Sequence, residues 1–221
     1  MYQNWDDLIF LHWVCSPQEV QSRLPQGLIV DTFESQAHIS IVGFKMNKVR
    51  PAYLPALPWL SFFNELNVRV YVQDTRGTPG VYFFSLDCDN APAVAIARKF
   101  FNLNYVHTKI NFKTRTKSHE LIAQRKESKQ VAQFKWQTGK NSQKAKPGTL
   151  DFHLTERYNF FTEKNGKLLR GQVYHEPYEL IDVNCSEFTD APIVWNNFSS
   201  QQRPPDLIHA CRGVKLRAFS L

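Results

Sequence analysis

Charged side chains interrupt several apolar segments of this sequence, and they are the residues best placed to do chemistry. Glu65 opens an apolar strand-like stretch and Arg69 lies in its middle, while Arg98 interrupts an apolar helical stretch. Glu156 and Arg157 stand in a further stretch of strand-like character. Burying a charge is costly unless it is paired. These residues therefore predict either structural salt bridges or an interior polar pocket in which charges and aromatic rings converge on a small ligand.

The chemistry of such a pocket follows from the residue types. Arg69 or Arg98 would bind a carboxylate or a similar oxyanion through two parallel hydrogen bonds, and Glu65 would act as an acid, a base or a hydrogen-bond acceptor. We expect Glu65 and Arg98 to lie in one interior cavity and to be energetically coupled. The full set of predicted ligand-binding residues is Glu65, Arg69, Arg98, Tyr105, Tyr71 and His12.

The histidines and cysteines do not form a recognisable metal or catalytic motif. His12, next to Trp13 in an apolar strand, is more typical of a hydrogen-bonded core histidine, and His175 is interpreted in the same way. The sequence contains no Walker loop, GxGxxG, HExxH, GxSxG or zinc-finger spacing. No metal and no cofactor are therefore expected. The four cysteines are far apart and contain no CxxC pair, which favours a reducing cytoplasm.

The first residues and the apolar runs also bear on location. Asp6 and Asp7 precede the first short apolar stretch, and no basic segment comes before it, which argues against a secretory signal. No apolar run approaches the roughly 18–20 residues that a transmembrane helix needs. We therefore expect a cytoplasmic protein without a membrane partner.

The elements that would position these residues are mostly strands. Alternation at 65–73 puts Asn67, Arg69 and Tyr71 on one face of a strand. Helices are expected after the Ser16–Pro17 pair and after Asn90, where a capping side chain precedes proline. Strands are expected at 8–15, 28–33, 37–46, 65–73 and 81–88, three times between 104 and 136, in the strand-like stretch 150–161 and at 168–180. Loops are expected at 50–60 and at 139–148. Aromatic side chains are expected to anchor the first of these loops.

The basic residues are concentrated in one segment. Between Lys109 and Lys146 there are eleven Lys or Arg and two acids, a local charge of +9, so the other residues sum to −2. Such a segment would meet an anionic partner or form a solvated sheet face. Because Phe112, Phe134 and Trp136 fall at core-facing positions, only weak nucleic-acid binding without sequence preference is expected.

Four stretches in order along the chain carry a family resemblance. They are LIFLHWVCSPQEVQSRLPQGLIVDTF, FFNELNVRVYVQDTRGTPGVYFFSLDCDN, AVAIARKFFNLNYVHTKI and LTERYNFF with LLRGQVYHEPYEL. These resemble the YqjF-like family of uncharacterised bacterial proteins, in the acetoacetate decarboxylase-like superfamily. The resemblance implies one domain over residues 1–221. It implies an α+β, β-dominated fold, a mostly antiparallel closed or cone-like sheet with about two short helices.

The resemblance also bears on catalysis. In the decarboxylases, a lysine beside a second lysine in a desolvated pocket forms a Schiff base with the substrate ketone. The family pattern Tyr-Pro-Lys-Lys is replaced here by Leu103-Asn104-Tyr105-Val106, while Glu65 and Arg98 match the superfamily pattern. We therefore expect a protein that binds a small, anionic organic molecule without imine chemistry. A lyase that uses Lys109 is the alternative, and homo-oligomer formation stays an open alternative.

Overall fold

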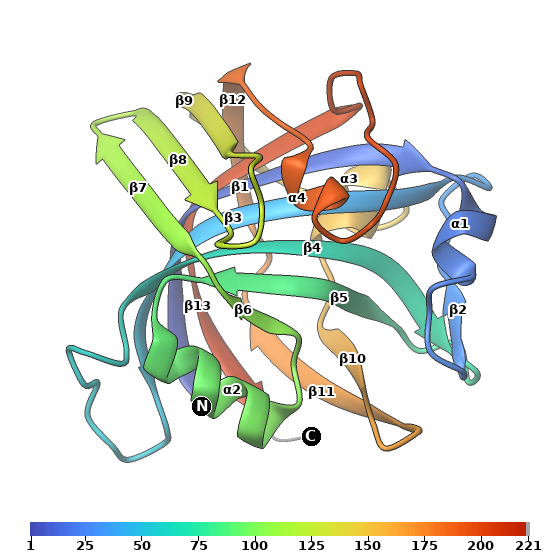
Figure 1. Ribbon diagram of the computed structural model, residues 1–221. Helices are drawn as coiled ribbons and strands as arrows, with labels where there is room; N and C mark the ends of the chain where they lie inside the picture. The colour runs from blue at the N-terminus through green and yellow to red at the C-terminus, as the bar shows by residue number, and fades with distance from the viewer. Residues whose placement is uncertain (220–221) are drawn as a thin grey trace.

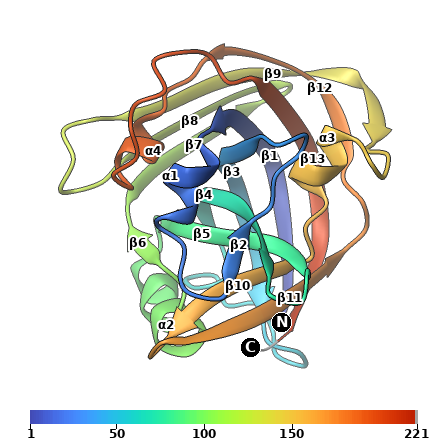
Figure 2. The ribbon, with the colours of Figure 1, turned by 90° about the vertical axis from the view of Figure 1, so that its right-hand side faces the viewer.

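A 13-stranded sheet forms most of the computed structural model, which describes residues 1–219 except for the side chains of Phe100 and Phe101. Part of the sheet closes on itself, because its last strand also pairs with its first. We call this closed part the ring, and Figure 2 looks into it. In order around the ring, its strands are β1 (Tyr2–Cys15), β3 (Ala37–Arg50), β4 (Phe63–Asp74), β5 (Pro79–Cys88), β10 (Asn159–Lys164), β11 (Lys167–His175) and β13 (Leu207–Phe219).

The remaining long strands continue from β13 and fold over the outside of the ring, as Figure 1 shows. We call them the outer layer. They are β12 (Glu179–Glu187), β9 (Ala132–Lys144), β8 (Ser118–Gln124) and β7 (Lys109–Arg115). Two short strands complete the sheet: β2 (Leu28–Val30) pairs with β4, and β6 (Tyr105–His107) pairs with β5.

The ring strands are apolar on both faces because both faces are covered. Ile9, Leu11 and Trp13 of β1 pack outward against Leu121 and Phe134 of the outer layer, in the main hydrophobic core. The alternate residues of β1 point into the ring, where Leu8 and Phe10 form a second core. A side-chain period of two produces this division. The β-dominated fold class predicted from the sequence is confirmed.

Strand β4 carries several of the polar residues of the ring interior. Leu66, Val68, Val70 and Val72 all belong to the outward core, so the alternate residues face inward. Those inward residues are Glu65, Asn67, Arg69 and Tyr71, and each is buried. The predicted facing of this strand is therefore confirmed, and the inward charges lie in a mixed polar and apolar interior.

The two predicted helices are present with their predicted caps. Ser16 caps α1 (Pro17–Gln21) and Asn90 caps α2 (Ala91–Phe101); each side chain accepts a hydrogen bond from a backbone N–H of the first turn. Two further short helices are α3 (Leu150–Thr155) and α4 (Ala191–Val194). The strand prediction for 150–161 is wrong over its first half, because the Thr149 side chain accepts a hydrogen bond from Phe152 N and starts a helix.

Three other expectations differ from the structure. The loop predicted at 139–148 is strand over 139–144, since β9 continues there and pairs with β12. The segment after Pro204, for which no strand is expected, forms β13 and closes the ring. The segment 51–60 is a loop, but its aromatic residues do not anchor it: the Tyr53 side chain is fully exposed and Trp59 is 62% exposed.

Among the helices of residues 1–219, none has the length and apolar character that crossing a membrane requires.

Candidate functional site

Arg69 lies inside the ring, and the described residues give it no acidic partner. Its Nη2 donates to the Leu154 carbonyl oxygen at 2.9 Å, and its guanidinium lies over the Phe10 ring at 5.4 Å. The Nε atom of Arg69 is buried and has no hydrogen-bond partner. Among the described residues, no carboxylate lies within ion-pair distance of this side chain, which is 6% exposed. The buried guanidinium therefore has an Nε donor with no acceptor among the described residues.

Strand register places His12, Ser40 and Arg69 side by side on three neighbouring strands of the ring. Ser40 of β3 pairs with His12 of β1 on one side and with Arg69 of β4 on the other. The Ser40 Oγ lies 2.7 Å from His12 Nδ1 and 2.8 Å from the Tyr71 hydroxyl. Tyr71 also donates to the Leu154 carbonyl at 2.9 Å, the same oxygen that accepts from Arg69. The Tyr71 hydroxyl and the Arg69 guanidinium are therefore neighbours.

Glu65 forms a second polar group farther along β4. Its Oε2 accepts from the Tyr105 hydroxyl at 2.8 Å, and its Oε1 accepts from Asn67 Nδ2 at 3.2 Å. Burial raises the pKa of Glu65 to about 7, against the opposing effect of these two hydrogen bonds. The carboxyl group therefore gains or loses a proton near neutral pH, as a general acid or base must. Burial also raises the pKa of Tyr105, so its phenol stays protonated and donates.

Arg98 does not join this interior. It lies on the exposed side of α2, and its Nε donates to the Tyr105 carbonyl oxygen at 2.6 Å. The predicted pairing of Glu65 with Arg98 is wrong, because a helix on the outside of the ring carries Arg98 and Tyr105 stands between the two charges. Arg98 instead lines an open polar cleft of about 400 Å³; the other lining residues are Phe84, Ser85, Asn102, Leu103, Asn104, Tyr105, Val106 and Asn196.

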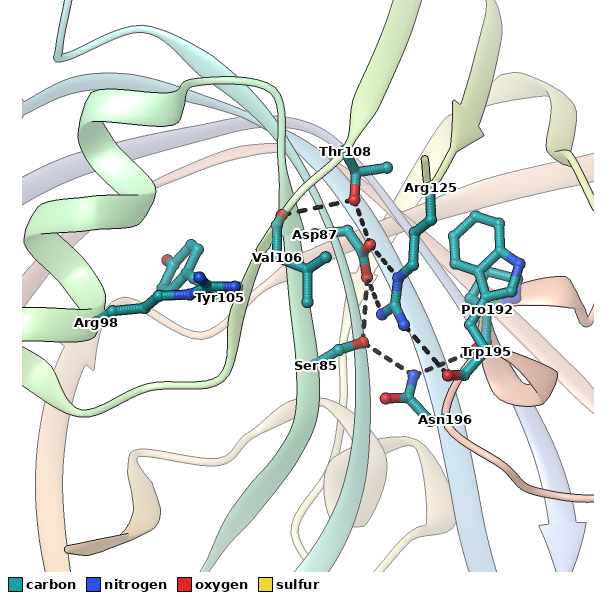
Figure 3. Close-up of polar contacts among 10 residues, drawn as sticks. All are labelled: Ser85, Asp87, Arg98, Tyr105, Val106, Thr108, Arg125, Pro192, Trp195 and Asn196. Atoms are coloured by element: carbon teal, nitrogen blue, oxygen red, sulfur yellow. Dashed lines mark hydrogen bonds and ion pairs between the residues drawn. The ribbon is translucent and has the colours of Figure 1, made fainter. Parts of the chain in front are cut away.

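A buried ion pair lies near this cleft, and Figure 3 shows it apart from Arg98. Arg125 binds fully buried Asp87 through Nε at 2.6 Å and Nη2 at 2.7 Å. Thr108 and Ser85 donate to the same carboxylate, at 2.5 and 3.1 Å. Arg125 also donates to the Trp195 carbonyl oxygen. All acceptor positions are used within the protein, so this network is a structural clamp between β5 and the outer layer.

The charges at 156 and 157 are also satisfied within the protein. Glu156 accepts from the Tyr158 hydroxyl at 2.5 Å and from Tyr178 N at 2.9 Å. Arg157 pairs with Asp31 at 2.7 Å. Glu156 and Arg157 therefore fit the prediction of structural pairing rather than the prediction of a ligand pocket. Among the buried charged side chains of the described residues, Arg69 differs from Glu65 and Glu156 in being a cation, and its Nε has no hydrogen-bond partner.

The buried residues that the structure describes include no lysine that could form an imine inside the ring. Lys109 is exposed at the start of β7, and none of the buried residues in 1–219 is a lysine. The basic segment forms β7, β8 and β9, whose Phe134 and Trp136 lie in the core with Phe112 packed against it. These aromatic rings are therefore not available for stacking on bases. Within the described part of the chain, no group of three His, Cys, Asp or Glu side chains could hold a metal ion.

Some interior residues escape sequence reasoning. Ser40 carries no charge, and His209 is far from His12 in the sequence. Only the pairing of the strands brings them to His12, which lies 3.0 Å from His209. The alternation at 65–73 predicts that Asn67 shares a face with Arg69 and Tyr71, but Asn67 is not among the predicted ligand-binding residues. The run of alternate polar residues in an apolar strand is a signal that could have identified it.

Comparisons with known proteins agree with this architecture. The family model DUF2071, described as an uncharacterized conserved protein, matches residues 2–215. The uncharacterized protein YqjF of Bacillus subtilis (strain 168) is 34% identical over 196 residues, which cover 86% of this chain and 81% of YqjF.

Solved structures share the fold at low identity. Acetoacetate decarboxylase from Legionella pneumophila subsp. pneumophila str. Philadelphia 1 superposes with a TM-score of 0.64 at 12% identity, covering 100% of this chain and 86% of that one. The enduracididine biosynthesis enzyme MppR, complexed with pyruvate, gives 0.62 at 10% identity, covering 98% and 86%. The chain therefore belongs to the DUF2071 family and has the acetoacetate decarboxylase-like fold.

Proposed function

We propose that this protein binds a small organic carboxylate inside the ring and that Arg69 holds the carboxylate group. The observation that carries the proposal is the buried Arg69 guanidinium, which has no ion-pair partner among the described residues and has an unused Nε donor. An uncompensated buried charge is strongly unfavourable. A carboxylate ligand would supply the missing charge and accept two parallel hydrogen bonds from the guanidinium.

The surroundings of Arg69 favour an anion over a cation. Burial lowers the pKa of His12, His175 and His209, and the positive charge of Arg69 lowers each of them further. These imidazoles are therefore neutral at neutral pH. Arg157 also lies near the Tyr71 ring, but it is paired with Asp31, so Arg69 is the cation of this region that has no ion-pair partner among the described residues. The nearby carboxylate of Glu156 is already bound by Tyr158 and by a backbone N–H.

Glu65 is the candidate acid or base for a bound ligand. Its pKa of about 7 means that both protonation states are populated at neutral pH. A reaction catalysed by this carboxyl group would use no imine, because no buried lysine accompanies it in residues 1–219. The proposal therefore covers a carboxylate-binding protein and an enzyme that works without a Schiff base.

The structural relatives support the choice of ligand class. MppR is complexed with pyruvate, and pyruvate is a small carboxylate. The proposed site requires a small ligand with one carboxylate group. Pyruvate meets this requirement, so it is a suitable probe. The alternative site for such a ligand is the outer cleft, where the Nη atoms of Arg98 have no partner among the described residues.

Calorimetric titration with pyruvate tests the proposal, using Arg69→Gln and Arg98→Gln as a matched pair. Loss of a charged hydrogen-bonding partner is expected to weaken binding by about tenfold or more in Arg69→Gln, with no change in Arg98→Gln. Circular dichroism checks that both variants fold. Binding that depends on Arg98 and not on Arg69 would contradict the proposal, as would the identification of a cationic or neutral copurified molecule by mass spectrometry of the denatured protein.

A further inference from the structure

A continuous chain of hydrogen bonds runs from the surface into the ring beside Arg69. Asp151 Oδ1 lies 3.1 Å from His209 Nε2, and His209 Nδ1 lies 3.0 Å from His12 Nε2. His12 Nδ1 then lies 2.7 Å from Ser40 Oγ. Neither the family resemblance nor the proposed ligand site accounts for it. We call these four residues, Asp151, His209, His12 and Ser40, the polar chain.

The polar chain leads from a partly exposed carboxylate to the buried interior of the ring. The Asp151 side chain is 39% exposed, whereas His209 is 7% exposed and His12 is fully buried. Ser40 is fully buried as well, and it contacts the Tyr71 hydroxyl at 2.8 Å. Tyr71 shares the Leu154 carbonyl oxygen with Arg69. The inner end of the polar chain therefore lies at the proposed carboxylate position.

The hydrogen bonds of the polar chain all point the same way. A carboxylate only accepts, so His209 Nε2 must donate to Asp151. A neutral imidazole has one donor and one acceptor, so His209 Nδ1 accepts from His12 Nε2. By the same argument, His12 Nδ1 accepts the Ser40 hydroxyl proton. The lowered pKa values of His12 and His209 agree with neutral rings.

We infer that the polar chain is a proton relay that carries a proton between solvent and a ligand held at Arg69. Ser40, His12 and His209 each have a proton to give and a lone pair to receive one, and the Asp151 carboxylate can accept the last proton. A core that needed only packing would place apolar side chains here, since buried polar networks are costly unless each member is satisfied. The use of the relay by a ligand rests on the proposed function, whereas the relay itself does not.

The step balances without any other reactant. The Tyr71 hydroxyl first turns its proton from the Leu154 carbonyl oxygen to Ser40 Oγ, 2.8 Å away. A carbon acid on the ligand then gives its proton to the Tyr71 oxygen, while the Tyr71 proton passes to Ser40 Oγ. The Ser40 proton passes to His12 Nδ1, and the proton on Nε2 of each histidine moves to the next group outward. Asp151 ends protonated, and the electron pair of the broken C–H bond stays on the ligand as an enolate beside Arg69. Reversal returns the proton and resets every group, so the relay suits a reaction that removes and then restores one proton.

Nuclear magnetic resonance of protein labelled with ¹⁵N-histidine tests the relay without any ligand. Both His12 and His209 should show the neutral form protonated on Nε2, and the His12 Nε2 proton should exchange readily with water despite its burial. His209→Gln keeps an oxygen that can accept from His12 but cannot pass a proton on, so exchange should slow by about tenfold or more because local opening becomes the remaining route. His107→Gln, at an exposed position, should change nothing.

The relay is wrong if either ring is protonated on Nδ1, or if His12 exchange is the same in His209→Gln as in the wild type. Should His209→Gln fail to fold, Asp151→Asn replaces the outer end of the chain at a partly exposed position and serves the same purpose. An unchanged rate in Asp151→Asn would count against the relay in the same way.

Deuterium exchange of the pyruvate methyl group in D₂O tests use of the relay by a ligand. The wild type should accelerate the exchange, and His209→Gln should lose about 10²-fold of that acceleration, the usual contribution of general base catalysis. Calorimetry on the same samples separates the two hypotheses. If pyruvate binds at Arg69 but its methyl protons do not exchange, the ligand does not use the relay. If pyruvate does not bind, the proposed function is contradicted. The relay itself is then tested by the histidine measurement alone.

Discussion

Tyr105 donates a hydrogen bond of 2.8 Å to Glu65 inside the ring, while the backbone of the same tyrosine binds Arg98 outside it. A phenol supplies a proton donor but no positive charge, so it offsets only part of the cost of burying the carboxylate. The pKa of Glu65 therefore stays near 7. A direct ion pair with Arg98 would have had the opposite effect and would have kept the carboxyl group ionised.

The raised pKa of Glu65 makes stability depend on pH. Between 4.5, the ordinary value, and about 7, the folded protein holds a proton that the unfolded chain has lost, so stability falls as pH rises through this range. Glu65→Gln removes this cost, which reaches on the order of 3 kcal/mol once the group is ionised in both states. Urea unfolding should show Glu65→Gln as more stable than the wild type at about pH 8, with little difference at about pH 5.

The control for this prediction is Glu127→Gln, an exposed position in a loop. Its difference from the wild type should be the same at both pH values. A Glu65→Gln variant that is less stable than the wild type under alkaline conditions would mean that the ionised carboxylate has a partner in the fold.

The Asp87–Arg125 pair should behave in the opposite way from Arg69. Because Asp87 is fully buried and bound to Arg125, whose side chain is only 12% exposed, Asp87→Asn or Arg125→Gln alone should lower the free energy of unfolding by about 3–5 kcal/mol. The double variant should lose less than the sum. The exposed Lys135–Glu187 pair, at 2.8 Å, is the matched control and should contribute less than about 1 kcal/mol. Additive losses at Asp87 and Arg125 would exclude their coupling.

Arg69→Met should not destabilise the protein in the absence of ligand. The substitution removes a buried charge that has no ion-pair partner among the described residues, so the cost of desolvating that charge disappears, and it leaves an apolar side chain of similar length in its place. Chemical denaturation of the dialysed protein measures the difference. A loss of about 3–5 kcal/mol, as expected for breaking a buried pair, would show that the fold itself compensates the guanidinium charge.

The protein should not form a trappable imine with pyruvate. Asn104 and Tyr105 occupy the positions at which the resemblance places a lysine pair, and Lys109 is exposed to water. An exposed amine stays protonated at neutral pH and is a poor nucleophile. Borohydride reduction followed by intact-mass measurement should reveal no stoichiometric adduct. An adduct that disappears in Lys109→Ala would instead support the lyase alternative.

Local signals carried most of the fold prediction. The proline after a capping residue correctly located both predicted helices, and the alternation at 65–73 correctly placed Arg69 and Tyr71 on the inward face. These features depend only on neighbouring residues. The strand after Pro204 was missed because its pairing with β1 joins the two ends of the chain. Such long-range pairing leaves no local trace.

The candidate site was harder to predict for the same reason. Sequence shows that Arg98 interrupts an apolar helix, yet it does not show which face of that helix meets the ring. Ser40 and His209 reach His12 only through cross-strand register and ring closure. Residue types therefore indicated which side chains could do chemistry, while the closed sheet determined which of them meet.

The central claim is that Arg69 binds a carboxylate inside the ring, and a crystal structure grown with pyruvate tests it most directly. We expect electron density for the ligand with its carboxylate on the Arg69 guanidinium, close to the hydroxyl of Tyr71. Density for pyruvate in the cleft at Arg98, or an Arg69 side chain that pairs with a carboxylate of the protein itself, would contradict the claim.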